Sequence, residues 1–258
     1  MPAMPQCVTL WIGDRLGPVE RACLRSVVRQ GHTIELYCYA NLEGVPDGVQ
    51  VHDASRILAA GHIFRQRNGS LAAFSDWFRY ELLKRGLGTW IDTDIYLLKP
   101  LDDRAEYLFG EEEEEGIINN AVLRLPASSA LLSSLLGIFE QRTALSWLPW
   151  RSAIAARARR LFTGQIDLKR LPWGATGPMA MSSLAREFGV AALAQPPDVF
   201  NPVPWSKADW ILDPAVKLEQ VTSERTVALH LWNYCISGFK DRPAPRGCFL
   251  DRLQREGA

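Results

Sequence analysis

Asp92 and Asp94 are separated by one residue and directly follow an apolar segment, residues 88–91, that is predicted to form a buried strand. In open α/β sheets, ligands bind beyond the carboxyl ends of the strands. If the chain stays extended here, alternate side chains share a face, so both carboxylates reach the same point. Adjacent carboxylates repel each other unless a cation lies between them, and Mg²⁺ and Mn²⁺ prefer oxygen ligands. Taken alone, the pair indicates either a divalent cation site that also binds a phosphorylated ligand or two aspartates that cap a turn.

A second pair of charged residues, Asp76 and Arg79, lies on the segment before this strand. Residues 70–85 carry apolar side chains at helical spacing, with Ser70 as a capping residue and Gly86 as the end of the helix. Residues three apart share one face of a helix, so Asp76 and Arg79 are neighbours. They form either a local ion pair or a carboxylate for sugar hydroxyls beside a guanidinium for a diphosphate.

The elements that must position these residues follow a βαβ pattern. Residues 7–12 and 33–39 are predicted strands, and residues 18–30 between them have the apolar spacing of a helix. Such a unit predicts parallel strands with a right-handed crossover. Further segments continue the pattern, namely strands near 49–51, 95–98, 116–123 and 226–231 and a helix at 131–141. We therefore expect one α/β domain over residues 1–258, a Rossmann-type, mostly parallel sheet flanked by helices, with a helical insertion at about 125–172.

The helix and the strand together resemble the SDxxRY … GGxYxDxD block of the DXD-motif sugar transferases. In this chain the block reads Ser75-Asp76-Trp77-Phe78-Arg79-Tyr80, then Gly88-Thr89-Trp90-Ile91-Asp92-Thr93-Asp94. That group includes globotriaosylceramide-synthase-like enzymes, yeast mannosyltransferases, capsular polysaccharide transferases and clostridial glucosylating toxins. The resemblance covers about a tenth of the chain. The expected Gly-Gly pair is Leu87-Gly88 here, and the usual tyrosine is Trp90.

Four shorter segments are similar to other parts of the same family. They are Leu10-Trp11-Ile12-Gly13, Asn119-Asn120-Ala121, Thr176-Gly177-Pro178 and His230-Leu231-Trp232-Asn233. By this resemblance Trp11 lies against the nucleotide base, and His230 adds a metal ligand. Trp232 and Asn233 belong to a late segment that closes over the diphosphate. Read from the residues alone, Trp11 is also a candidate core residue and His230 a structural histidine.

The resemblance implies a GT-A-like fold and a retaining, metal-dependent transfer of a hexose or N-acetylhexosamine. The donor is a nucleotide diphosphate sugar, above all a UDP-sugar, and the acceptor is a glycan or a lipid-linked hydroxyl. Asp92, Asp94 and His230 are then expected to hold Mn²⁺ or Mg²⁺, Arg79 to support the charge of the diphosphate, and Asp76 to orient sugar hydroxyls. A nucleotidyltransferase and a catalytically inactive sugar-nucleotide-binding protein stay open as alternatives.

Composition restricts the other classes of function and the cellular location. The formal net charge is zero, so no basic field favours nucleic acid. The five cysteines include no C-x-x-C pair, which argues against a disulfide framework or zinc knuckle and for a reducing, cytoplasmic location. The first five residues lack the pattern of a signal peptide, and no apolar run of about 18 residues predicts a membrane span.

Two charged segments remain. The acidic run 111–115 is predicted to be a solvated loop before the next strand. The segment from Trp147 to Arg160 combines two tryptophans with four arginines. It suits an acceptor glycan or an anionic membrane surface, with peripheral contact at the inner membrane face left open, and an ordinary helix packed by its alanines is the alternative.

Overall fold

The computed structural model describes residues 6–113 and 116–258. Its strands are β1 (Cys7–Trp11), β2 (Ile34–Cys38), β3 (Val49–Asp53), β4 (Thr89–Ile91), β5 (Ile95–Leu97), β6 (Leu108–Glu111), β7 (Ile118–Arg124) and β8 (Ala228–His230). Its α-helices are α1 (Pro18–Arg29), α2 (Ala72–Lys84), α3 (Ala130–Phe139), α4 (Trp150–Thr163), α5 (Pro178–Glu187), α6 (Pro197–Phe200), α7 (Leu218–Val221), α8 (Asn233–Ile236) and α9 (Phe249–Glu256). Short 3₁₀ helices occur at Ala54–Arg56, Ala60–His62, Leu168–Arg170, Ala191–Leu193 and Trp205–Leu212.

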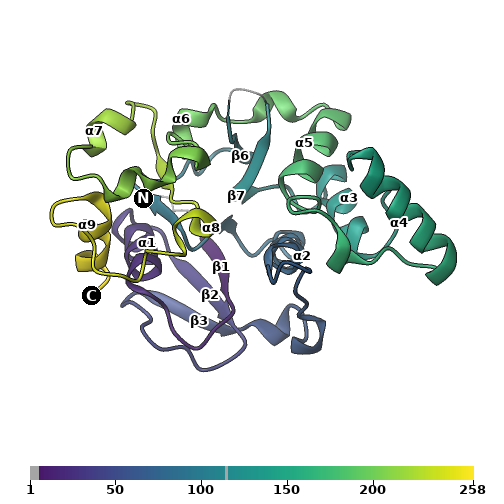
Figure 1. The fold of residues 1–258 in the computed structure, drawn as a ribbon, viewed down its shortest axis with the longest axis horizontal. Coiled ribbons are helices and arrows are strands. Elements are labelled where there is room, and N and C mark those ends of the chain that lie inside the picture. The colour runs from purple at the N-terminus through teal and green to yellow at the C-terminus, as the bar shows by residue number, and fades with distance from the viewer. Residues whose placement is uncertain (1–5, 114–115) are drawn as a thin grey trace.

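The main sheet has the strand order β3-β2-β1-β4-β7-β6 (Figure 1). The first four of these strands run in parallel, β7 runs antiparallel to its neighbours β4 and β6, and β6 therefore has the direction of the first four. The chain is therefore α/β with a mostly parallel sheet flanked by helices, as the βαβ pattern predicts. The strand order reverses direction at β1, so the carboxyl ends of β1 and β4 lie at a topological switch point, where ligands of such sheets bind.

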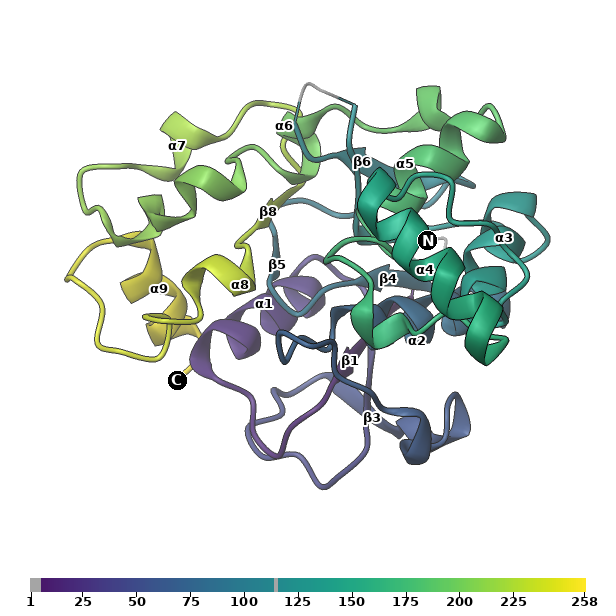
Figure 2. The same ribbon diagram turned by 45° about the vertical axis from the view of Figure 1, so that its right-hand side comes forward.

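Helices cover the two faces of the sheet, and alternate residues of each strand face one or the other layer. Val8 and Trp90 pack with α2, α3 and α5 in one apolar cluster, while Cys7 and Ile91 pack with α1 in a second. All four side chains are buried. Because both faces of the central strands are covered, almost every residue of β1, β2 and β4 is buried, rather than every second one. Figure 2 shows α2 and α1 on opposite sides of the strands.

The turn that joins α2 to β4 depends on glycine at one position. Gly88 has φ +140°, and a Cβ there would lie 2.6 Å from the backbone oxygen of Gln6. Any side chain at residue 88 would push β4 away from the strand it pairs with. Leu87 does not have a positive φ, so the backbone conformation at residue 87 does not require the first glycine of the expected pair.

A two-stranded antiparallel ribbon brings a distant part of the chain beside Asp94. β5 pairs with β8, with Ile95 opposite His230. Between β4 and β5, residues 92–94 form a turn in which the N–H of Ile95 donates to the carbonyl of Asp92 at 3.1 Å. The expectation of an extended chain at these residues was wrong, because the backbone turns here as it leaves the main sheet and enters the ribbon.

Other boundaries differ locally from the sequence prediction. α2 begins at Ala72, whose N–H donates to Oγ of Ser70, so the serine supports the first turn from two residues before the helix. The acidic run is not a solvated loop where it is described: Glu111 ends β6 and Glu112 is buried. Residues 114 and 115, like residues 1–5, lie outside the described part.

The predicted helical insertion, residues 125–172, contains two unlike helices. Leu131, Leu132 and Leu135 of α3 lie in the main apolar cluster, whereas α4 has no buried residue. In the described residues, no helix combines the length and apolar character needed to cross a membrane.

Candidate metal centre

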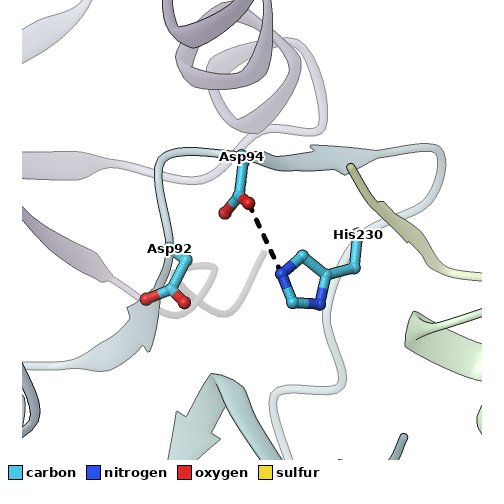
Figure 3. Close-up of side chains that lie close together, drawn as sticks. All are labelled: Asp92, Asp94 and His230. Carbon is cyan, nitrogen blue, oxygen red and sulfur yellow. Dashed lines mark ion pairs between the residues drawn. The ribbon is translucent and has the colours of Figure 1, made fainter. Parts of the chain in front are cut away.

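Asp92, Asp94 and His230 converge at the carboxyl end of the parallel strands (Figure 3). The two aspartates flank the turn after β4, and His230 is the last residue of β8. One ligand atom from each residue lies within 4.8 Å of the others. Nε2 of His230 is 3.4 Å from Oδ2 of Asp94. The structure thus assembles the three residues that were expected to hold a cation.

The ring of His230 is held in one orientation. Its Nδ1 lies 3.1 Å from Oδ1 of Asn201, which follows α6. The amide nitrogen of Asn201 donates to the carbonyl of Glu111 at 2.8 Å, which fixes the oxygen on the histidine side. An amide oxygen can only accept, so Nδ1 carries a proton and, in the neutral ring, Nε2 keeps its lone pair toward the aspartates.

Asp94 is the most strongly stabilised carboxylate of the group. Its burial opposes ionisation, but the facing His230 and the backbone N–H of Asn233, 2.6 Å from Oδ2, outweigh that effect and lower the pKa of Asp94. For His230, burial disfavours the charged ring, yet the neighbouring Asp94 raises the pKa of the imidazole above its usual value. Without a metal ion, the two residues therefore form a buried ion pair.

Asp92 faces a different set of neighbours. Its Oδ1 accepts from Nε1 of Trp90 at 2.6 Å and lies 3.1 Å from the guanidinium of Arg79. Burial raises the pKa of Asp92 to about 6, opposed by Arg79 and reinforced by the negative charge of Asp94. Asp92 is thus harder to ionise than Asp94, and a nearby cation would stabilise its ionised form.

Arg79 connects the cation site to the helix behind it. The guanidinium stacks 4.7 Å from the centroid of the Trp90 ring and is only 4% exposed. It also lies 3.5 Å from Asp76. Burial works against the charge of Arg79, but Asp92 and Asp76 raise its pKa, so the positive charge is retained. The indole in place of the expected tyrosine therefore both donates to Asp92 and supports the guanidinium.

Asp76 does not join the cation cluster. Its Oδ2 accepts from Thr176 at 2.7 Å and its Oδ1 accepts from Nδ2 of Asn120 at 2.9 Å. Asp76 thus fixes two segments that resemble family motifs, the Asn119–Ala121 segment and the Thr176–Pro178 turn, against α2. The local ion pair with Arg79 is present as well, and its predicted contact with sugar hydroxyls stays a prediction.

The late segment meets the site through its backbone. Trp232 has φ +56°, a left-handed conformation that is uncommon for a tryptophan, and it is 7% exposed. Its Nε1 donates to the carbonyl of Val203 at 2.8 Å, and its ring stacks on His230 with centroids 3.9 Å apart. This conformation points the N–H of Asn233 at Asp94, while the Asn233 side chain accepts from Nζ of Lys240 at 2.6 Å.

Trp11 lies where β1 ends, at the same edge of the sheet. It is half-buried, and its Nε1 donates to the carbonyl of Arg15 at 3.0 Å. The ring packs against the second apolar cluster and stays partly exposed, which is compatible with a core role and with a binding role. Its predicted contact with a nucleotide base is untested.

Sequence reasoning missed two polar residues beside the cluster. Asn201 gave no signal because its partner His230 belongs to another segment. Glu112 was assigned to the acidic loop, yet it is buried, accepts from Nδ2 of Asn119 at 3.4 Å and acts electrostatically on His230. Burial raises the pKa of the Glu112 carboxyl.

No protein-family model matches the chain, and a search of curated proteins finds no significant match. The function must therefore be argued from the geometry of the site.

Proposed function

We propose that this protein is a metal-dependent glycosyltransferase of the GT-A type that uses a nucleotide diphosphate sugar, most simply a UDP-sugar. The observation that carries the proposal is the convergence of Asp92, Asp94 and His230 at the switch point of the parallel sheet, with one ligand atom from each within 4.8 Å. The resemblance around Asp76, Arg79 and the two aspartates supports it. Transfer of a hexose or N-acetylhexosamine with retention follows from that resemblance.

The donor set fits the cation that such an enzyme requires. Two carboxylates and one imidazole are the oxygen and nitrogen ligands that suit Mn²⁺, and Mg²⁺ is compatible with the carboxylates. Asn201 holds the imidazole with Nε2 facing the carboxylates, as partners of metal-binding histidines do elsewhere. Among the described residues, no cysteine belongs to the cluster of Asp92, Asp94 and His230, so a thiolate-bound zinc site is not favoured.

Each residue of the chain has a defined task in this proposal. Asp92, Asp94 and His230 would hold Mn²⁺ or Mg²⁺, which when bound would supply electrostatic stabilisation to a leaving diphosphate. Arg79 keeps a positive charge beside Asp92 in a buried setting, where such charges act strongly. Trp11 offers an aromatic face for the base. The bond between the anomeric carbon and the diphosphate oxygen breaks, with its electron pair leaving on the nucleoside diphosphate. A bond to the acceptor oxygen forms, and the acceptor hydroxyl releases its proton to solvent.

A donor comparison tests the proposal. The protein is incubated with Mn²⁺ and labelled UDP-glucose, UDP-galactose or their N-acetyl forms, and release of UDP is followed with and without chelator. We expect release from at least one UDP-sugar, abolished by chelator. Turnover of nucleoside triphosphates in place of UDP-sugars would favour a nucleotidyltransferase. UDP-sugar binding without any hydrolysis or transfer would indicate a binding protein.

A further inference from the structure

The outward face of α4 carries large apolar side chains in solvent. Trp150 is 67% exposed, Ile154 58% and Leu161 86%. At 3.6 residues per turn these three positions fall within about 40° of each other around the helix axis. They line one side of the helix as an apolar stripe, which we call the α4 face. Phe162, about 100° further around the helix than Leu161, is 90% exposed.

The opposite side of α4 is already used for packing. Ala153 and Ala156 pack against the small apolar cluster of Leu148, Leu171 and Ala175. Nε1 of Trp147, just before the helix, donates a hydrogen bond to the carbonyl of Ala175 at 2.8 Å. Figure 1 places α4 at the outer margin of the molecule, beside α3. The helix therefore packs on the protein through its other side, and this packing leaves the α4 face exposed to solvent.

The segment around α4 is strongly basic in a chain without net charge. Residues 142–173 contain seven basic residues and one acidic residue, a net charge of +6. The whole chain has 29 of each sign, so the remaining residues carry −6. Asp167, the one acid of the segment, is paired with Arg159 and Arg170.

Two arginines border the α4 face itself. Arg151 is exposed and lies 5.1 Å from the ring of Trp150, and Arg157 is exposed on the other side of the stripe. Arg157 has no acidic partner in the part of the chain that the structure describes. An apolar stripe bordered by free cations is the pattern of a helix that lies in a membrane interface.

We propose that the α4 face is a docking surface for an anionic lipid bilayer. Trp150, Ile154 and Leu161 would enter the headgroup region, with Arg151 and Arg157 against lipid phosphates. The charge distribution favours this occupant, because a second copy of the chain on the same face would bring +6 against +6. The inference concerns a surface away from the three cation ligands and does not depend on the proposed glycosyl transfer.

Vesicle flotation of the full chain tests the proposal. Vesicles of phosphatidylcholine alone are compared with vesicles that also contain phosphatidylglycerol. We expect flotation with the anionic vesicles only, weakened by salt. Charge reversal in Arg157→Glu should lower binding at least fivefold, since each basic residue at an anionic surface contributes about that factor. The triple variant Trp150→Ser/Ile154→Ser/Leu161→Ser should lower it about tenfold or more.

Matched variants separate the α4 face from general effects. Arg104→Glu makes the same charge change at a side chain that is 94% exposed, and Leu193→Ser removes another exposed leucine. Both should float like the wild type, and all variants should keep the wild-type melting temperature. Wild-type protein that does not float, or α4 variants that float like the controls, would overturn the proposal. A dimer that needs the same three apolar residues would show instead that a second copy covers this face.

Discussion

Nδ1 of His230 lies 3.1 Å from Oδ1 of Asn201, while Nε2 of the same ring lies 3.4 Å from Oδ2 of Asp94. The two contacts use the two ring nitrogens separately. One nitrogen is committed to a hydrogen bond within the protein, and the other faces the carboxylates. If the site holds a cation as proposed, the histidine is already oriented for it, which limits the conformational cost of binding.

Removing the Asn201 acceptor should therefore weaken metal binding. We expect Asn201→Leu to lower Mn²⁺ affinity by about 10- to 100-fold, the usual effect of losing such an outer partner. Asn201→Asp keeps an oxygen beside Nδ1 and should retain most of the affinity. Calorimetric titration with Mn²⁺ measures both. Equal affinity for the wild type and the leucine variant would show that His230 is not a ligand through Nε2.

Asp94→Asn tests the cation site directly. Losing one well-placed electrostatic stabiliser should reduce UDP-sugar turnover by about a hundred- to thousand-fold. Mn²⁺ should raise the melting temperature of the wild type far more than that of the variant. The metal-free variant should also be less stable than the wild type, because the ion pair with His230 is lost.

Asp102→Asn is the matched control, since Asp102 caps a turn at the N–H of Arg104. It should leave turnover and the Mn²⁺ effect unchanged. An Asp94→Asn protein that stays active and insensitive to chelator would contradict the proposed function.

The raised pKa of Asp92 predicts how pH affects the metal-free protein. Folding moves this pKa from 3.8 to about 6. A group whose pKa is raised by folding favours the folded state below its unfolded pKa, and that contribution is lost as pH rises through the folded value. With chelator present, the wild type should therefore lose stability relative to Asp92→Asn from about pH 4 to about pH 7. Melting curves across this range give the difference.

Mn²⁺ supplies the control for the Asp92 prediction. A cation beside the carboxylate favours its ionised form, so saturating Mn²⁺ should remove or reverse the decline at the upper end of the range. If the difference between wild type and variant is the same at every pH, the environment of Asp92 in solution differs from the one described.

Trp11→Ala tests the base-binding role of the half-buried indole. If the ring covers a base, UDP affinity should fall by about 1–2 kcal/mol, as base–aromatic stacking contributes elsewhere. Trp11→Phe keeps an aromatic face and should retain most of the affinity, although it loses the bond to the Arg15 carbonyl. Calorimetry with UDP and a melting curve are read together. A loss of about 3–5 kcal/mol of stability in the alanine variant, without a specific effect on UDP, would make Trp11 a core residue.

Gly177→Ala tests the network around Asp76. A Cβ at residue 177 would lie 2.9 and 3.0 Å from the Asp76 carboxylate oxygens and 3.1 Å from Nδ2 of Asn120. We expect a loss of about 1–3 kcal/mol in unfolding free energy, typical of overpacking, with lower turnover. Gly61→Ala is the control, because its Cβ would meet no atom within 4 Å. Equal stability of the two variants in chemical denaturation would argue that the Asp76 network can rearrange freely.

The sequence alone determined the parts that depend on local patterns. Apolar spacing at helical period predicted α1 and α2, and short strand-forming runs predicted β1, β2 and β4, all close to their observed bounds. The same local order placed Asp92 and Asp94 at the end of a buried strand and Asp76 beside Arg79 on one helix face. These relations hold because neighbours in a strand or helix are fixed by the repeat of that element.

The tertiary structure decided the relations between distant segments. Only the pairing of β5 with β8 places His230 beside Asp94, and only the packing of α6 places Asn201 behind that ring. The run of like charge at residues 111–115 predicted a solvated Glu112, because such runs are usually solvated. In the structure Glu112 follows the end of β6, which pairs with β7, and is buried. Long-range pairing and burial depend on the whole core, so no local period in the sequence carries them.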